Sequence, residues 1–180
     1  LLDSIIIKNN SNKKNGSGIF INNSNVSIKN LACNNNFSDN DGGCIYVKKS
    51  ELVLDNSQFY LNESSDDGGA LSGEFSQIFI NNSNANNNIA KDKGGAFVLK
   101  DCTVNITNSK INNNISSYGG GVFDRNNKIN IVNSNLIENT AKEFGGGIYS
   151  HSSNLFLDSS IIGSNISTDK GGGMYLTKSI

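Results

Sequence analysis

The residues that could carry chemistry in this 180-residue chain are acids that stand beside glycine pairs. Asp66 and Asp92 each lie two positions before a Gly-Gly pair. Two carboxylates that face one sugar can hydrolyse a glycosidic bond, and clustered carboxylates can bind Ca²⁺. Lys91 and Lys93 flank the second acid, however, which indicates a solvated, charge-balanced edge. We therefore predict no catalytic residue and no cofactor, and only a weak Ca²⁺ edge at Asp66 and Asp92.

His151 is the only histidine of the chain and Arg125 its only arginine. They fall in different repeats, each among polar residues, and no repeated acid stands opposite either of them. We expect both to be solvated turn residues, and we expect that the protein is not an enzyme. The alternative is a polysaccharide lyase or hydrolase, which would be expected to carry long inserts that interrupt the repeat.

A row of aromatic residues is a second candidate site. The row recurs at one position of the repeat, where Ser72 and Val98 interrupt it, and consists of Phe20, Tyr46, Phe123, Tyr149 and Tyr175. The preceding position is always apolar, so strand alternation predicts that these rings point outward as a surface aromatic stripe. Such a stripe could bind glycan rings or pack against another protein. If a glycine corner breaks the alternation, the rings belong to the core instead.

The elements that must position these residues follow from an internal repeat. Glycine markers stand 26 residues apart, with one step of 25, and coils begin near residues 16, 42, 68, 94, 119, 145 and 171. Three apolar positions recur in each period, and none shows helical spacing. This predicts an all-β fold, a right-handed parallel β-helix of about seven coils with three short strands per coil. Residues 1–180 are expected to form a single segment of a longer solenoid.

Asparagine is the most abundant residue type of the repeat, and proline is absent. One column holds asparagine in every full coil: Asn36, Asn62, Asn88, Asn114, Asn139 and Asn165. Stacked carboxamides can hydrogen-bond to one another along the axis, so this column predicts a structural ladder. A second column, which includes Asn82 and Asn108, suggests another ladder. Proline would break the strand pairing almost anywhere in such a fold.

The composition excludes some partners. The net charge is −1 and one arginine is present, so no basic face for nucleic acid is expected. No apolar run is long enough to cross a membrane, so a membrane would be reached only through segments outside this chain. Cys33, Cys44 and Cys102 lack zinc or redox spacing. We interpret them as thiols, with their disulfide state and compartment left open.

Two short motifs carry a family resemblance. The stretches GGAL (68–71) and GGAF (94–97), together with FYLN (59–62), resemble the repeats of the chlamydial polymorphic outer membrane proteins (Pmp). Elsewhere the aromatic of the second motif is replaced, as in INNN (111–114) and LIEN (136–139). The resemblance implies a surface-exposed or secreted β-helical passenger, related to pectin-lyase-like folds and used in adhesion. Extracellular or cell-surface localisation is expected on that ground.

We therefore predict a non-catalytic structural or adhesive β-helix protein that presents an extended interaction face. One alternative is a carbohydrate-binding or polysaccharide-cleaving β-helix; another is a subunit of an extracellular filament, or of a ciliary or cell-wall coat. Expected partners are other proteins or further copies of the chain, with glycans as a further class. Asn25, Asn81 and Asn105 are the candidate glycosylation sites, because each begins an Asn-x-Ser/Thr sequon outside the main ladder.

Overall fold

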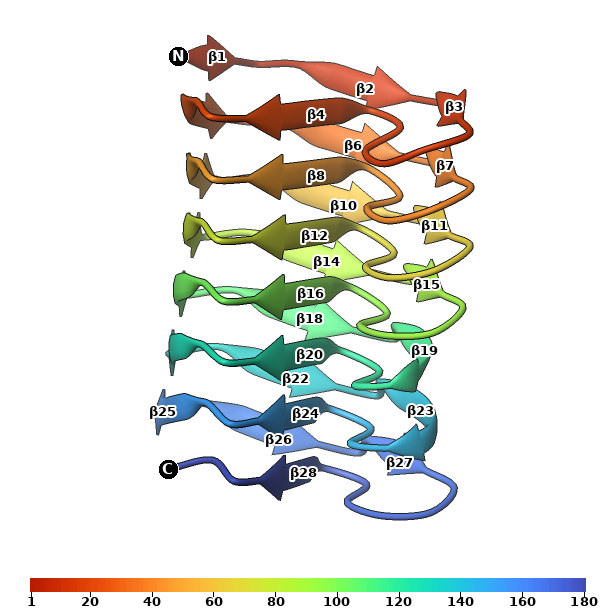
Figure 1. Ribbon diagram of the computed structural model, residues 1–180, viewed down its shortest axis with the longest axis vertical. Coiled ribbons are helices and arrows are strands. Elements are labelled where there is room, and N and C mark those ends of the chain that lie inside the picture. Colours follow the sequence, from red (N-terminus) through yellow and green to blue (C-terminus); the bar gives the residue numbers. More distant parts are fainter.

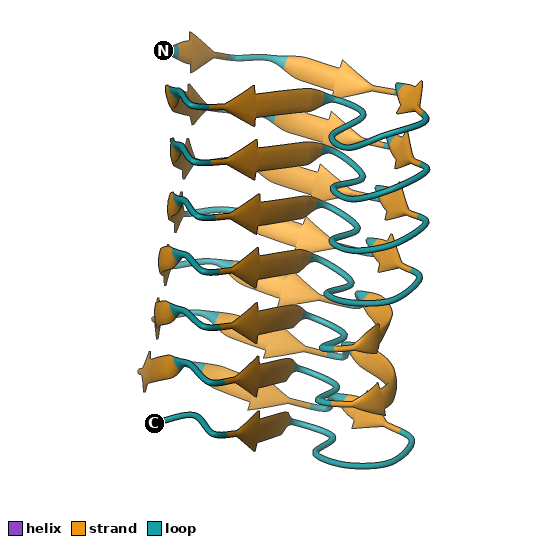
Figure 2. Ribbon diagram, viewed as in Figure 1, coloured by secondary structure: helices purple, strands orange, loops and turns teal.

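The computed structural model describes residues 1–180 and consists of strands and turns without a helix. Figure 2 shows the strands stacked in coils that descend from the N-terminus to the C-terminus. In Figure 1, β2 (Ile6–Lys8) runs rightward at the back and β4 (Ile19–Asn22) returns leftward at the front as the chain descends, so the coil is right-handed. No helical segment has the length and apolarity to span a bilayer.

Four parallel seven-stranded sheets, here called A to D, form the walls of the solenoid. Sheet A contains β1 (Leu2–Asp3), β5 (Asn25–Lys29), β9 (Glu51–Asp55), β13 (Gln77–Asn81), β17 (Thr103–Thr107), β21 (Lys128–Val132) and β25 (Asn154–Asp158). Sheet B contains β2, β6 (Ala32–Asn34), β10 (Gln58–Tyr60), β14 (Asn84–Asn86), β18 (Lys110–Asn112), β22 (Asn135–Ile137) and β26 (Ile161–Gly163). Sheet C contains β3 (Ser11–Asn12), β7 (Phe37–Ser38), β11 (Glu63–Ser64), β15 (Ile89–Ala90), β19 (Ile115–Tyr118), β23 (Thr140–Phe144) and β27 (Ile166–Ser167). Sheet D contains β4, β8 (Ile45–Lys48), β12 (Leu71–Glu74), β16 (Phe97–Lys100), β20 (Val122–Arg125), β24 (Ile148–His151) and β28 (Met174–Thr177).

The parallel β-solenoid of about seven coils is confirmed, but each full coil has four strands where three were predicted. The additional strand belongs to sheet C and is short, often two residues. Its inward position holds small side chains such as Ser38, Ser64 and Ala90, all of them buried. An apolar pattern therefore does not reveal this strand, because a serine in a strand looks like a serine in a turn.

Each corner between sheets places one residue per coil in the left-handed backbone region. Asparagine fills many of these positions, as Asn82 does with a φ of 49°, because its short polar side chain tolerates this conformation. At the corner between sheets C and D the residue is always glycine. Gly42, with a φ of 67°, shows why: a Cβ there would lie 2.3 Å from the Ile45 carbonyl oxygen.

The interior is one continuous apolar column. Inward residues of sheets A, B and D, together with corner residues such as Leu31 and Cys102, form a single cluster of 27 buried side chains. In sheet A the pair Leu52 and Leu54 stacks in register on Ile78 and Ile80 of the next coil. Every interior position thus packs above and below on a position of the same type, which keeps the coils in register.

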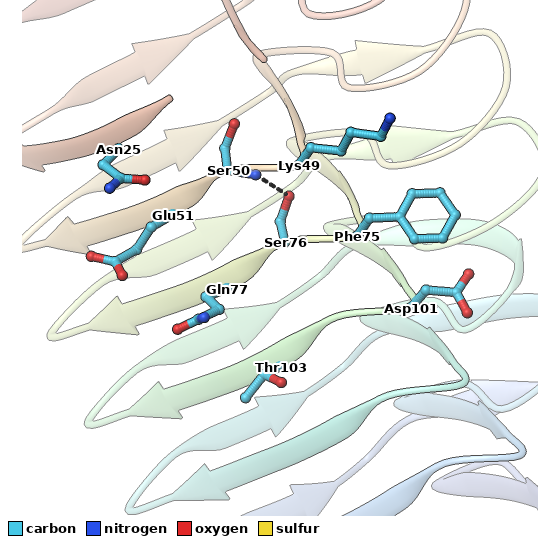
Figure 3. A pocket seen from close by; sticks show the side chains of 9 residues that line it. All are labelled: Asn25, Lys49, Ser50, Glu51, Phe75, Ser76, Gln77, Asp101 and Thr103. Carbon is cyan, nitrogen blue, oxygen red and sulfur yellow. Dashed lines mark hydrogen bonds between the residues drawn. The ribbon is translucent and has the colours of Figure 1, made fainter. Parts of the chain in front are cut away.

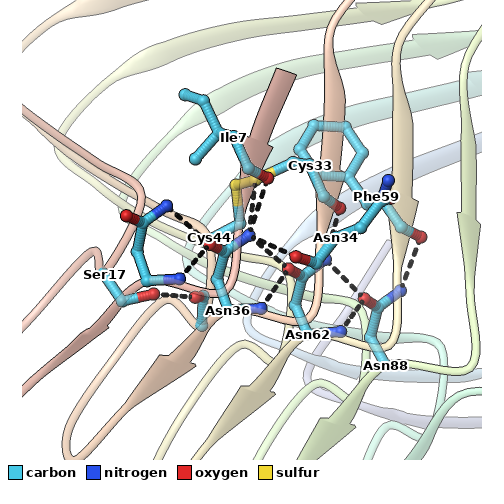
Figure 4. The surroundings of a disulfide bond; sticks show 11 residues. Ile7, Ser17, Cys33, Asn34, Asn36, Cys44, Phe59, Asn62 and Asn88 are labelled. Atoms are coloured by element: carbon cyan, nitrogen blue, oxygen red, sulfur yellow. Dashed lines mark hydrogen bonds between the residues drawn. A yellow bond between two sulfur atoms is a disulfide. The ribbon is translucent and has the colours of Figure 1, made fainter.

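The predicted asparagine ladder is confirmed. Each member donates from Nδ2 to the Oδ1 of the next member at 2.9–3.0 Å, from Asn36 through to Asn165. Asn88 also donates from Nδ2 to the Phe59 carbonyl oxygen of the preceding coil at 3.1 Å. The ladder begins one coil earlier, at Asn10, whose Nδ2 donates to Asn36. Figure 4 shows three rungs as a line of hydrogen bonds along the axis.

The second asparagine column forms a single rung, from Asn56 Nδ2 to Asn30 Oδ1 at 2.6 Å, and no continuous ladder. Asn82 makes no bond to Asn108 and donates instead to the Asp55 carboxylate at 2.9 Å. Its members occupy left-handed corner positions with exposed side chains, so the requirement at this column is backbone conformation. The neighbouring serines are the structural element: the Ser83 amide donates to the Ser109 hydroxyl at 3.1 Å, and this pattern repeats along the column.

Cys33 and Cys44 form a disulfide bond, which corrects the interpretation of all three cysteines as thiols. Both half-cystines are fully buried, and the bond crosses the interior next to the Asn36 rung, as Figure 4 shows. The Asn36 Nδ2 lies 3.3 Å from the Cys33 sulfur. Cys102 remains a free, buried thiol, and burial raises its pKa to about 11.

Candidate functional site

The outer face of sheet D brings together most of the chemically distinctive side chains. Along β20, Val122 and Asp124 point into the interior, so Phe123 and Arg125 point outward. The loops from sheet C to sheet D fold back over this face. The residue before a marker glycine reaches the strands in several coils: Asp67 contacts Lys100 at 2.6 Å, and the Lys93 ammonium stands 5.8 Å from the Phe123 ring centroid. The outer face of sheet D is therefore bordered along one side by the loops that connect sheet C to sheet D, here called the loop wall.

The predicted aromatic stripe lies on this face but is divided into two parts. Phe20 and Tyr46 stack at 5.4 Å between ring centroids. Phe20 is 59% exposed, whereas Tyr46 is only 4% exposed, so the expectation of a surface residue is wrong for Tyr46. Ser72 and Val98, which interrupt the row, are fully buried beneath the loop wall. Strand alternation correctly predicts that these side chains point outward from sheet D, but it does not reveal the loop that covers them.

The second part of the stripe is a cluster of five rings in the C-terminal coils. Phe123, Tyr149 and Tyr175 stack in sequence, with centroids 4.8 and 5.2 Å apart. Tyr118 meets Tyr149 edge to face at 6.0 Å, and Phe144 stacks on Tyr175 at 4.9 Å. Phe123 is 5% exposed, so it too departs from the predicted surface position. Tyr149 and Tyr175 remain half-buried.

Tyr118 and Phe144 are not members of the aromatic column that the sequence predicts as the stripe. They precede the marker glycines Gly119 and Gly145, where earlier coils carry Asp41 and Asp67. The one-residue deletion of the repeat is taken up here, as a register shift between β19 and β23 next to Tyr118. The change of residue type at this loop position was the available signal.

A cavity of about 590 Å³ lies against this cluster and is lined by Asp92, Lys93, Tyr118, Phe123, Arg125, Tyr149 and His151. Arg125 and His151 are in-register partners on β20 and β24. The expectation that they are unrelated turn residues is therefore wrong. Both stand six residues after a marker glycine, and this common spacing already places them in one column.

The two basic side chains have no partner within the chain. Lys100 precedes them in the same column and is neutralised by Asp67, which reaches across from the preceding coil. The equivalent loop positions for Arg125 and His151 hold Lys93 and Tyr118, so the acid is missing. No ion pair or side-chain hydrogen bond from Arg125 or His151 is formed.

The other walls of the cavity are fixed by their own contacts. Lys93 pairs with Asp92 and lies 3.7 Å from an Asp67 oxygen, and its ammonium stands 5.8 Å from the Phe123 ring centroid. The Tyr118 hydroxyl donates to Glu143, and this bond together with burial raises the pKa of Tyr118 to about 12. Burial, followed by the proximity of Tyr175, raises the pKa of Tyr149.

The acidic edge differs from the predicted pair Asp66 and Asp92. Asp66 groups with Asp41 and Asp67, with carboxylate oxygens within 4.8 Å of one another. Asp92 pairs with Lys93 instead. Burial, and then the charge of Asp67, raises the pKa of Asp41 to about 6. Lys93 and Lys100 both approach Asp67, so two lysines already offset part of the negative charge of the cluster.

A second cavity, of about 540 Å³, follows the corner between sheets D and A. Figure 3 shows two serines, Ser50 and Ser76, as its floor, with Phe75 and Asp101 on one side and Gln77 on the other. Phe75 is 55% exposed in a left-handed corner position. Apart from this ring the lining is polar.

The candidate glycosylation sites lie on sheet A. Asn25 is exposed, while Asn81 and Asn105 are half-buried. Asn81 accepts a hydrogen bond from Thr107 and Asn105 accepts one from Asn130, both at 2.8 Å. These bonds engage Oδ1, whereas a glycan is attached to Nδ2, so they fix the two side chains without occupying the atom that would be modified. Asn25 is the most exposed of the three.

Behind the aromatic cluster, the interior contains a buried carboxylate. Asp124 is fully buried and accepts hydrogen bonds from Ser150, at 2.7 Å, and from Asn127. Burial raises its pKa, and these hydrogen bonds partly oppose that shift. These hydrogen bonds hold the inner face of β20 in place against the interior, and they thereby position Phe123 and Arg125 on the outer face of the strand.

Comparison with known proteins adds no relative: no family model, no curated protein and no solved structure matches the chain. The geometry itself defines the class of protein, a parallel β-solenoid with buried asparagine ladders. The likeness to Pmp repeats consequently remains one of short motifs.

Proposed function

We propose that this protein is a non-catalytic adhesion module, a rigid solenoid that contacts its partner through the outer face of sheet D. The observation that carries the proposal is the cluster of five rings beside the unpaired Arg125 and His151. Exposed aromatic and arginine side chains are enriched at binding surfaces, where they supply contact area at small cost in conformational entropy.

The regular scaffold supports the same proposal. Two columns of polar side chains, the asparagine and the serine ladders, are bonded from coil to coil. The residues that break this regularity collect on one face, namely Tyr118, Phe144, Arg125 and His151. Function tends to reside where a site departs from the local rules of its scaffold.

Extracellular placement is part of the proposal. The buried Cys33–Cys44 disulfide supports it, because disulfides persist in secreted and surface proteins and are rare in reducing compartments. The fully buried position shields the bond from reductants. Intact-mass analysis of native material, for the disulfide and for glycans at Asn25, would test this placement.

The contact face can be tested with a double variant, Tyr149→Ser with Tyr175→Ser. Serine already occupies this column at Ser72, so the substitution is compatible with the strand. Labelled protein would be measured against immobilised matrix glycoproteins and cell-surface polysaccharides by biolayer interferometry. We expect at least a tenfold loss of affinity, because two partly exposed rings at a contact each contribute on the order of 1 kcal/mol.

Tyr60→Ser is the matched control, because Tyr60 is 46% exposed on sheet B, away from the cluster. Equal binding of the double variant and the control would contradict the proposed contact face. The competing enzymatic function is tested by a reducing-end assay on acidic and neutral polysaccharides. Turnover that is abolished by Asp66→Ala or Asp92→Ala would replace adhesion with catalysis.

A further inference from the structure

We infer that the cavity between Arg125 and Tyr118 is a binding site for an anionic sugar, whose carboxylate or sulfate group is held by Arg125 and His151. This inference rests on the proposed function and names the ligand class of the same face. The unpaired charge is the first observation that leads to it.

The repeat itself shows what is missing from this cavity. One coil earlier in the column, Lys100 receives the Asp67 carboxylate from the loop wall at 2.6 Å. The same loop position offers Lys93 to Arg125 and Tyr118 to His151, so neither side chain receives a carboxylate from it. The one acid that lines the cavity, Asp92, is paired with Lys93. A ligand anion placed where the missing carboxylate would lie completes the pattern. The planar guanidinium of Arg125 can bind both oxygens of a carboxylate or sulfate group at once.

The rest of the cavity fits a ring attached to that anion. Tyr118 stands perpendicular to Tyr149, with an interplanar angle of 80°, so the two rings form a corner rather than a closed stack. Phe123 stacks on Tyr149, also lines the cavity and is almost completely buried. The Tyr149 hydroxyl and Asp92 add a donor and an acceptor for ring hydroxyls. Three aromatic rings and four charged or polar side chains thus line the cavity, so it offers both ring faces and hydrogen-bonding groups to a sugar.

The volume is compatible with a short oligosaccharide. At about 590 Å³, the cavity is within the usual range for ligand pockets. The second cavity, at Phe75, is of similar size, but its charged residues are one lysine, Lys49, and two acids, Glu51 and Asp101. The cavity at Tyr118 has the opposite balance, with one acid beside Lys93 and Arg125. An anion is therefore disfavoured in the cavity at Phe75, and the two cavities should differ in the ligand charge they accept.

The test is isothermal titration calorimetry of the intact protein with three probes. A heparin tetrasaccharide carries sulfate groups, trigalacturonate carries carboxylates only, and maltotriose is neutral. We expect binding of at least one anionic probe, weakened by added salt, and no binding of maltotriose. The two anionic probes distinguish sulfate from carboxylate as the preferred group.

Arg125→Gln is expected to weaken that binding at least tenfold, because a charge-assisted bidentate contact is lost. Lys128→Gln is the matched control: it removes the same charge from the exposed end of β21 in sheet A, outside the cavity. Unfolding midpoints should be equal for both variants, since Arg125 makes no contact that supports the fold. Equal losses in both variants, or equal affinity for maltotriose, would overturn the inference.

The two proposals fail in different ways. If no anionic probe binds, but the Tyr149 and Tyr175 double variant loses its partner in the adhesion assay, the ligand class is wrong and the contact face stands. If the double variant also keeps its partner, both proposals are wrong. Loss of probe binding in Arg125→Gln alone supports both.

Discussion

Replacement of one rung of the asparagine ladder, Asn88→Ala, should cost about 4 kcal/mol of unfolding free energy. The Asn88 side chain makes four hydrogen bonds. It donates to the Phe59 carbonyl and to Asn114, and it accepts from the backbone and side-chain amides of Asn62. A net contribution of about 1 kcal/mol for each gives the estimate.

The loss of unfolding free energy should not be smaller than this estimate, because the former hydrogen-bond partners of Asn88 are buried and cannot bond to water instead. Asn62 is fully buried and Phe59 is 1% exposed, so two donors and one acceptor would be left without partners. An unsatisfied buried polar group typically costs about 1–3 kcal/mol. The backbone amide of Asn88 keeps its bond to Asn114 at 2.9 Å, so the corner itself is retained.

The measurement is urea unfolding followed by circular dichroism, with the slope compared between variants to check that the same surface unfolds. Asn86→Ala is the matched control: its side chain makes no hydrogen bond, and it should change stability by less than about 0.5 kcal/mol. If Asn88→Ala cost under about 1 kcal/mol, or no more than the control, the ladder would not be a source of stability.

Three further outcomes are expected. Thiol titration in denaturant should find one reactive cysteine, Cys102, before reduction and three after it, and Cys33→Ser should lose about 3 kcal/mol by the loop-closure relation. Asp41→Asn should stabilise the protein by up to about 3 kcal/mol above pH 6, because the pKa of Asp41 is raised to about 6 in the folded state and ionisation of this carboxyl therefore destabilises the fold. Urea melts at a series of pH values should show this gain fading as the pH drops toward 4. Gly95→Ala should cost about 3 kcal/mol or more in the same melts, since its Cβ would lie 2.2 Å from the Gly120 carbonyl oxygen of the next coil.

The architecture could be predicted because a solenoid repeats each physical requirement in every coil. A buried asparagine such as Asn88 recurs at the same offset, and so do Leu52 and Leu54 or their equivalents on the inner face of sheet A. Stacked positions share one environment, so a column of the sequence reports the environment several times. Sheet C was missed because its inward residues are small, as at Ser64, and its strands too short for an alternation pattern.

The candidate site was harder to predict because it consists of exceptions. Arg125 and His151 occur once each, and only their common distance from a marker glycine relates them. The burial of Tyr46 depends on a loop that folds over sheet D, and no periodicity encodes that cover. The Cys33–Cys44 bond joins different columns, so the repeat gives no indication of their proximity.

The arrangement of the sheets also determines how the protein would carry a mechanical load. Neighbouring strands of every sheet belong to successive coils, so their hydrogen bonds run along the solenoid axis. Tension along that axis would open one pair of coils at a time, in the manner of a zipper. A partner held on the outer face of sheet D pulls across the axis instead. That force is shared by the strands of several coils, so the column is strongest in the direction in which such a contact would load it.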